Sequence, residues 1–277
     1  MIITTIGDEI GTTLEEQIKA LKEVNAKYIE IRKINNMYIW EYSEEQIKRI
    51  KEELEKKEIK VIAIDTPIGK KKNSFNYAEN KKILDKYVEI ANIFETKYLR
   101  IFSDIGKRAE FESIKEVIEE MAKIAHKNKL ELLIENERNT YAEDISTCER
   151  LIENEKNVYI LYDIENAYSR GYNVLKEYEK NKSKIKYIHI RDYNEKTKKY
   201  VYFGEGTIPI LELLRRLKRD NYDGIISLET MLPKYNKNES KKDIFVKSYA
   251  SLMRIKNMEE WNESSILWYN RKFSKRY

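Results

Sequence analysis

The sequence predicts a single (β/α)8 TIM barrel, a ring of parallel strands surrounded by helices, with a short C-terminal extension. Short apolar, β-branched runs alternate with charged segments of helical periodicity, which is typical of a parallel sheet. Eight such units within about 255 residues fit a closed barrel. An open doubly wound sheet usually carries a Gly-rich phosphate turn after a strand. The one such cluster, Gly204-Glu205-Gly206, does not open a helix directly after a strand. We therefore assign residues 1–258 to the barrel and 259–277 to the extension.

The strands are expected where the apolar runs fall, because parallel strands are buried on both faces. These runs span residues 2–6, 27–32, 60–64, 97–102, 130–135, 158–163, 185–190 and 224–229. A helix is expected after each run, and two helix starts have capping-box spacing. Thr12 and Thr13 precede Glu15 and Glu16 by three residues, and Ser43 precedes Gln46 by three.

Composition bounds the class of protein. The chain has 277 residues, of which 41% are hydrophobic and 36% charged, with a formal net charge of +5. The two signs are mixed along the helices, whereas a nucleic-acid binder usually concentrates positive charge on one face. With Cys148 as the one cysteine, no intrachain disulfide can form, and no window approaches the roughly 18 apolar residues of a membrane span. The N-terminus does not resemble a signal peptide. We expect a soluble, cytoplasmic protein that uses neither a membrane nor a nucleic acid.

The last residues, 262–277, interleave aromatic and basic side chains. Such a pattern occurs in proteins that contact nucleic acids or anions. We favour an extension packed on the barrel or on a partner subunit, which leaves a homodimer open.

Ionisable residues interrupt or close six of the apolar runs. They are Glu30, Arg32, Arg100, Glu135, Asp163, His189 and Glu229. In a barrel the carboxyl ends of the strands form the active site, and the side-chain period of two directs each of these residues into the lumen. The other histidine, His126, lies among lysines in a predicted helix, and we expect it at the surface.

Four of these residues, Glu135, Asp163, His189 and Glu229, come from four consecutive strands. Adjacent strands lie about 4.8 Å apart, so side chains at equal height can converge. Three carboxylates without a cation would repel one another. Carboxylates with one imidazole form a hard ligand set. The pattern predicts one divalent metal ion, Mn²⁺ in the first place, with Mg²⁺, Co²⁺ or Zn²⁺ as alternatives.

Two arginines on the strands have two interpretations. Arg32 and Arg100 could pair with Glu30 inside the barrel, or they could bind an anionic or polyol substrate. The sequence favours neither.

Several segments together resemble the xylose isomerase-like TIM-barrel superfamily, and in particular its sugar phosphate isomerase/epimerase family. They are Tyr28-Ile29-Glu30-Ile31-Arg32, Leu133-Ile134-Glu135-Asn136, Tyr162-Asp163-Ile164-Glu165-Asn166-Ala167, His189-Ile190-Arg191-Asp192, Gly204-Glu205-Gly206 and Tyr222-Asp223-Gly224-Ile225-Ile226-Ser227-Leu228-Glu229. The resemblance implies that Glu135, Asp163, His189 and Glu229 bind a divalent metal, with the two glutamates as acid/base groups. Two positions depart from the family pattern. Asn166 stands where many epimerases have a histidine, and Arg191 stands where lysine is frequent.

The favoured function is isomerisation or epimerisation of a small sugar or sugar derivative. The metal would act as a Lewis acid and stabilise an enediolate. One of Glu135 and Glu229 would remove the proton next to the carbonyl, and the other would return it. The residues expected to bind the substrate are Glu30, Arg32, Arg100, Asn166 and Arg191. Dehydration of a cyclic polyol or keto acid and a non-catalytic sugar-binding barrel are the alternatives. Phosphodiester cleavage needs several metals and histidines, which the chain does not offer.

Overall fold

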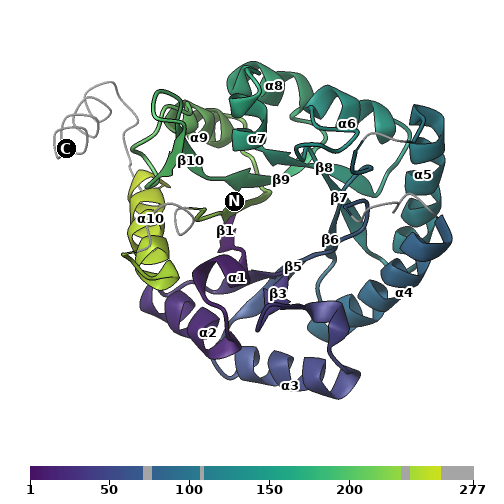
Figure 1. The fold of residues 1–277 in the computed structure, drawn as a ribbon, viewed down its shortest axis with the longest axis horizontal. Coiled ribbons are helices and arrows are strands. Elements are labelled where there is room, and N and C mark those ends of the chain that lie inside the picture. The colour runs from purple at the N-terminus through teal and green to yellow at the C-terminus, as the bar shows by residue number, and fades with distance from the viewer. Residues whose placement is uncertain (71–76, 107–108, 232–237, 257–277) are drawn as a thin grey trace.

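The computed structural model describes residues 1–70, 77–106, 109–231 and 238–256. Eight parallel strands form a nearly closed barrel in the order β1-β12-β9-β8-β7-β6-β5-β2, with the helices arranged around it (Figure 1). The ring is completed between β1 and β2 by a parallel bridge that pairs Ile6 with Glu30. The strands are β1 (Ile2–Thr5), β2 (Tyr28–Ile31), β5 (Lys60–Asp65), β6 (Tyr98–Ile101), β7 (Glu131–Glu135), β8 (Val158–Asp163), β9 (Ile185–Ile190) and β12 (Ile225–Leu228). The predicted fold class is confirmed.

The helices follow the strands as expected. They are α1 (Gly7–Ile10), α2 (Leu14–Glu23), η1 (Ile39–Glu41), α3 (Glu44–Glu55), α4 (Tyr77–Phe94), α5 (Phe111–Lys127), α6 (Ile145–Leu151), α7 (Ile164–Ser169), α8 (Val174–Asn181), α9 (Ile210–Arg219) and α10 (Lys241–Lys256). Both of these helices begin with a capping box. At α2, Thr13 with Glu16 forms it rather than Thr12 with Glu15, and at α3 Ser43 with Gln46 forms it. The one-turn helix α1 and the short helix α7 were not predicted.

The barrel lumen has an apolar floor and a polar layer above it. The floor is a separate buried cluster that consists of Ala63, Tyr98, Leu133, Leu161, Tyr187 and Ile225. Each of these residues lies two positions before a polar residue of the same strand, so both point to the same side. The polar layer consists of Asp65, Arg100, Glu135, Asp163, His189 and Ser227, all of them buried. The alternation of the strands thus collects ionisable groups at the carboxyl end of the barrel.

Two hairpins that were not predicted lie in the loops at this end. One pairs β3 (Lys33–Ile34) with β4 (Met37–Tyr38), and the other pairs β10 (Asp192–Asn194) with β11 (Lys199–Val201). The Asp192 carboxylate accepts hydrogen bonds from the backbone N–H groups of Gly204 and Gly206, both at 2.9 Å. A Cβ atom on Gly206 would lie 1.9 Å from Oδ1 of Asp192. The Gly-Glu-Gly cluster therefore anchors a loop.

Three further predictions concern His126, membrane-spanning helices and the C-terminal extension. His126 is exposed, as predicted. Within the described ranges, no helix is both long and apolar enough to cross a bilayer. The expected extension at 259–277 lies outside the described residues, so its packing and the homodimer stay predictions.

Candidate metal centre

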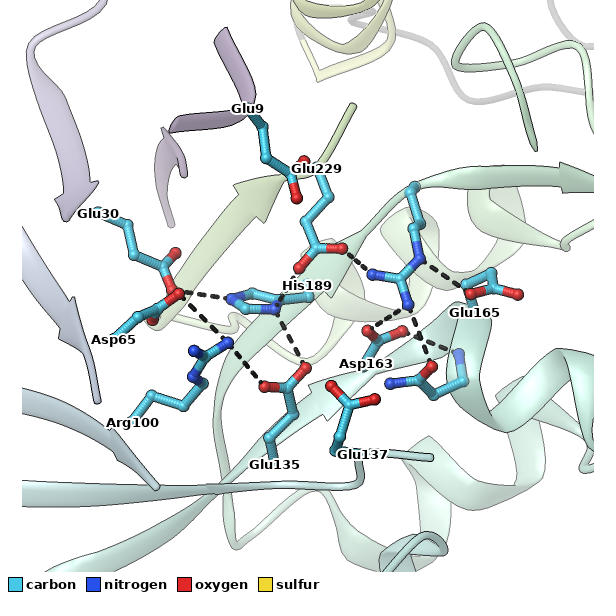
Figure 2. A network of polar contacts seen from close by, with 12 residues as sticks. Glu9, Glu30, Asp65, Arg100, Glu135, Glu137, Asp163, Glu165, His189 and Glu229 are labelled. Carbon is cyan, nitrogen blue, oxygen red and sulfur yellow. Dashed lines mark hydrogen bonds and ion pairs between the residues drawn. The ribbon is translucent and has the colours of Figure 1, made fainter. Parts of the chain in front are cut away.

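The four residues expected to bind a metal converge at the carboxyl end of the barrel (Figure 2). Glu135, Asp163, His189 and Glu229 each offer one ligand atom, and these atoms all lie within 4.8 Å of one another. All four side chains are buried. They come from the ends of β7, β8, β9 and β12, which are neighbours in the sheet. The structure therefore brings together the set that the sequence singled out.

His189 lies between carboxylates on both sides of its ring. Its Nδ1 atom is 2.9 Å from Oε1 of Glu229 and 3.6 Å from Oε1 of Glu135. Its Nε2 atom is 3.0 Å from Oε1 of Glu30. The Tyr187 hydroxyl donates to the other Glu30 oxygen at 2.7 Å. Glu30 and Tyr187 thus fix the ring with Nδ1 directed at the two glutamates.

Glu30 was expected either to bind the substrate or to pair with Arg32 and Arg100, and it lies in neither position. The side chain is fully buried and does not line the cavity described below. Among the described residues its ion-pair partner is His189, whereas Arg32 and Arg100 pair with other carboxylates. The interpretation that these arginines pair with Glu30 is wrong. The reason is that Glu30 faces β9 across the lumen, a relationship that strand order alone does not reveal.

The carboxylates and the cations around them shift one another's pKa values. Burial raises the pKa of Glu135, but Arg100 and His189 more than offset it and hold that pKa below its usual range. Burial lowers the pKa of His189, yet Glu30 and Glu135 together raise it to about 10. Burial, with the like charges of Glu135 and Glu165, raises the pKa of Asp163 to about 6 against the opposing effect of Arg191. The cluster is short of positive charge and favours cations.

The donor atoms fit a divalent ion. Nδ1 of His189 and Oδ2 of Asp163 are buried and lie 2.9 Å from Glu229 and 2.8 Å from Arg191, but neither contact has the geometry of a hydrogen bond. One imidazole nitrogen and three carboxylate oxygens form a hard ligand set, suited to a divalent ion of the Mn²⁺ or Mg²⁺ type. Buried polar atoms whose hydrogen-bonding capacity is not used are rare in native structures and call for an explanation such as an ion.

Arg191 lies at the other edge of the cluster. Its Nη2 atom is 2.8 Å from Oδ2 of Asp163 and donates to Oδ1 of Asn166 at 3.1 Å. Its Nη1 atom pairs with Oε2 of Glu229, and its Nε donates to Oε2 of Glu165 at 2.9 Å. The Asn166 backbone N–H in turn donates to Asp163 at 2.9 Å, as the cap of α7. Arg191 therefore connects two candidate ligands with Asn166.

Glu165 was missed by the sequence analysis although it is fully buried. It pairs with both Arg191 and Arg138 and accepts a hydrogen bond from the Tyr200 hydroxyl at 3.2 Å. A lone glutamate in a helical segment is typical of a solvated face. Only its place inside a motif of the family resemblance distinguished it.

Asp65 was missed as well, because the third strand was predicted to end at Ile64. The Arg100 guanidinium lies 3.2 Å from Asp65 and 3.0 Å from Glu135, and so bridges two buried carboxylates. Burial and the like charge of Glu30 raise the pKa of Asp65 well above its usual range, against the effect of Arg100. The signal was present in the sequence, since Asp65 closes an apolar run as Glu135 does.

A cavity of about 520 Å³ opens over the cluster. Its walls are formed by Asp8, Glu9, Arg32, Lys70, Arg100, Glu135, Glu137, Arg138, Asn139, Asn166, Arg191, Tyr200, Glu229, Thr230, Met231 and Lys241. Of the four converging residues, Glu135 and Glu229 reach the wall, while Asp163 and His189 lie beneath it. Four of the five residues expected to bind substrate, Arg32, Arg100, Asn166 and Arg191, also line the cavity. The lining is rich in hydrogen-bonding groups, which suits a polar ligand.

Fold and site together define a (β/α)8 barrel with a buried carboxylate–histidine cluster at its mouth. Residues 18–251 match the family model described as xylose isomerase-like TIM barrel, and the chain belongs to that family. No curated protein matches the sequence.

Solved structures with low sequence identity share the fold over nearly the whole chain. The structure titled IOLI protein with a binding zinc atom has a TM-score of 0.78 at 17% identity, covering 95% of this chain and 100% of its own. A D-tagatose 3-epimerase-like protein has a TM-score of 0.74 at 20% identity, covering 98% and 99%. The probable 3-DHS dehydratase AsbF from Bacillus anthracis has a TM-score of 0.75 at 15% identity, covering 91% and 99%. Sugar epimerases are prominent among the similar structures.

Proposed function

We propose that the protein is a metal-dependent isomerase or epimerase of a small sugar or sugar derivative. One observation carries the proposal: Glu135 and Glu229 both line the cavity and both approach the same imidazole nitrogen. Two carboxylates that face one bound molecule can remove a proton and return one. Asp163 and His189, which lie beneath them, would complete the ligand set for a divalent ion.

The proton-transfer groups are held in place by cations. Arg100 pairs with Glu135, and Arg191 pairs with Glu229, so each carboxylate is held in place. A carboxylate is a weak base in water, and a closed, partly desolvated cavity would strengthen its interaction with the substrate. A divalent ion, when bound, would supply Lewis-acid polarisation of a substrate carbonyl.

Three further groups would orient the substrate. Arg32, Arg191 and Asn166 line the cavity and offer donors to hydroxyl or carbonyl oxygens. Asn166 can hydrogen-bond a hydroxyl but cannot shuttle a proton. Proton transfer in this chain would therefore rest on the two glutamates.

Dehydration of a polyol or keto acid is the second candidate. It is supported by the similarity to a probable 3-DHS dehydratase and begins with the same proton abstraction. The two reactions differ in their products, because dehydration loses water and forms a double bond.

Turnover of a panel of ketoses by the Mn²⁺-loaded protein in D₂O tests the proposal. We expect a product isomeric with the substrate and deuterium at a carbon next to the carbonyl. Glu229→Gln and Glu135→Gln should each lower the rate by about 10²–10⁴-fold, the usual contribution of a positioned acid or base. The exposed Glu53→Gln serves as the matched control. Full activity in Glu229→Gln would overturn the proposal, and an unsaturated product with loss of water would favour the dehydratase.

A further inference from the structure

Glu9 is a buried carboxylate of the cavity wall that the proposed chemistry does not use. It lies in α1, directly after β1, and its side chain points into the mouth of the barrel beside Glu229 (Figure 2). It is 8% exposed. It does not belong to the converging group of four. Glu9 is neither a candidate metal ligand nor one of the two proposed acid/base groups, so its position in the cavity wall needs a different explanation.

Glu9 is held rigidly by the residue that follows Glu229. The backbone N–H of Thr230 donates to Oε2 of Glu9 at 2.7 Å, and the Thr230 hydroxyl donates to the Glu9 carbonyl at 3.3 Å. Among the described residues, the other carboxylate oxygen, Oε1, accepts one long hydrogen bond, from Nη2 of Arg32 at 3.4 Å. A carboxylate oxygen has two lone pairs, so Oε1 keeps acceptor capacity at the cavity wall.

Arg32 is oriented from its other side. Its Nε and Nη2 atoms donate to the Asp8 carboxylate at 3.0 and 2.9 Å. Lys241 fixes the same segment, because its Nζ donates to the Asp8 carbonyl at 2.8 Å. A guanidinium has five N–H donors, and these contacts leave donors for a ligand. An acceptor and a donor group thus stand side by side on one wall.

We propose that Glu9 and Arg32 form a subsite for two adjacent hydroxyl groups of the substrate. One hydroxyl would donate to Oε1 of Glu9, and the neighbouring oxygen would accept from Arg32. Neither β1 nor β2 carries a residue of the converging cluster. The subsite would therefore bind a part of the substrate other than the reacting carbons, and it rests on the proposed function for the identity of that substrate.

The same chemistry selects against a phosphate at this position. An ionised carboxylate only accepts hydrogen bonds, and a fully ionised phosphate has no proton to donate to it. Arg32 and Lys241 balance the charges of Asp8 and Glu9 on this wall, so the selection rests on the acceptor at Glu9. The inferred substrate is an unphosphorylated polyhydroxy compound, at least at the end that enters this subsite.

Calorimetric titration of the Mn²⁺-loaded protein tests the subsite. The probes are D-tagatose, D-allulose and L-ribulose, each with its terminal deoxy analogue and its terminal phosphate. For the ketose that binds most tightly, Glu9→Gln should weaken binding by about 10- to 100-fold, as expected for a charge-assisted hydrogen bond. The same substitution should leave the affinity for the deoxy analogue within about twofold, because the two changes remove one interaction. The exposed Glu15→Gln is the matched control.

The wild-type protein gives a test that does not depend on the variant's folding. It should bind the parent ketose at least about tenfold more tightly than either the deoxy analogue or the phosphate. Equal affinity for parent and deoxy sugar, or tighter binding of the phosphate, would overturn the subsite even if turnover supports the proposed function. Binding with this selectivity but without turnover would support the subsite and contradict the proposed function. If no ketose binds, both are wrong.

Discussion

Oε1 of Glu30 lies 3.0 Å from Nε2 of His189, on the side of the ring opposite to the nitrogen that faces Glu135 and Glu229. Both side chains are fully buried. A carboxylate behind a ligating imidazole fixes the orientation of the ring and increases its basicity as a ligand. Glu30 therefore supports the candidate metal centre without belonging to the converging group.

This arrangement predicts a loss of metal affinity in Glu30→Gln. The amide preserves the size of the side chain but removes the charge that faces Nε2. Calorimetric titration with Mn²⁺ should give a dissociation constant about 10- to 100-fold higher than that of the wild type, the usual effect of removing such a partner. Circular dichroism would establish that the variant is folded. An unchanged affinity in a folded variant would contradict the assigned role.

Arg100 predicts a stability effect. It lies between Asp65 and Glu135, and all three groups are buried. Arg100→Met fills a similar volume but removes the cation that holds the pKa of the buried Glu135 below its usual range, and breaking a buried ion pair in this way costs about 3–5 kcal/mol of unfolding free energy. Denaturant unfolding measures this, with Arg49→Met as the control. Arg49 is 70% exposed and pairs with Glu45 of its own helix, and we expect a change within about 0.5 kcal/mol there. Wild-type stability in Arg100→Met would refute the bridging role.

Asp192 predicts a dependence of stability on pH. Burial raises its pKa to about 6 from the ordinary value of 3.8, although backbone N–H groups of Gly206, Gly204 and Tyr193 oppose the shift. Between these two values the unfolded chain has lost the proton and the folded chain retains it. Stability contributed by this group is therefore present at acidic pH and falls as pH rises through about 4 to 6. The total is about 3 kcal/mol, from a shift of about two pKa units.

The difference between the wild type and Asp192→Asn isolates this group, because the amide does not titrate. Denaturant unfolding from pH 4 to 7 should show the wild type losing stability relative to the variant. A constant difference would show that the hydrogen bonds from the glycine loop cancel the effect of burial, and a difference that grows in favour of the wild type would show that they outweigh it; either result would contradict the prediction.

The fold could be predicted from the sequence because the alternation of apolar strands and amphipathic helices extends over long segments. Strand positions agree with the expected runs to within about two residues, the ordinary uncertainty of element boundaries. The short elements were missed for a physical reason. Helix α1 and the two hairpins contain two to four residues per element, too few to show a period of 2 or 3.6.

Site residues at the ends of strands could be predicted from the sequence. Site residues whose contacts depend on packing across the lumen could not. Alternation placed Glu135, Asp163, His189 and Glu229 on one side of the sheet, and the structure brings them together. Glu30, the partner of His189, lies several strands away, and Glu9 lies in the short helix α1, which was not predicted. Strand alternation gives the direction of a side chain but not the residue opposite to it.

We propose that Glu135, Asp163, His189 and Glu229 together hold one divalent ion. The decisive experiment is a titration of the chelator-treated protein with Mn²⁺, with elemental analysis of the complex. We expect one ion per chain, and a melting temperature that rises with Mn²⁺, because an ion at 100 times its dissociation constant adds about 2.7 kcal/mol of stability. Asp163→Asn, which removes one donor charge, should bind at least about tenfold more weakly. A wild-type protein that binds neither Mn²⁺ nor Co²⁺, or that binds Mn²⁺ as well after Asp163→Asn, would contradict the account.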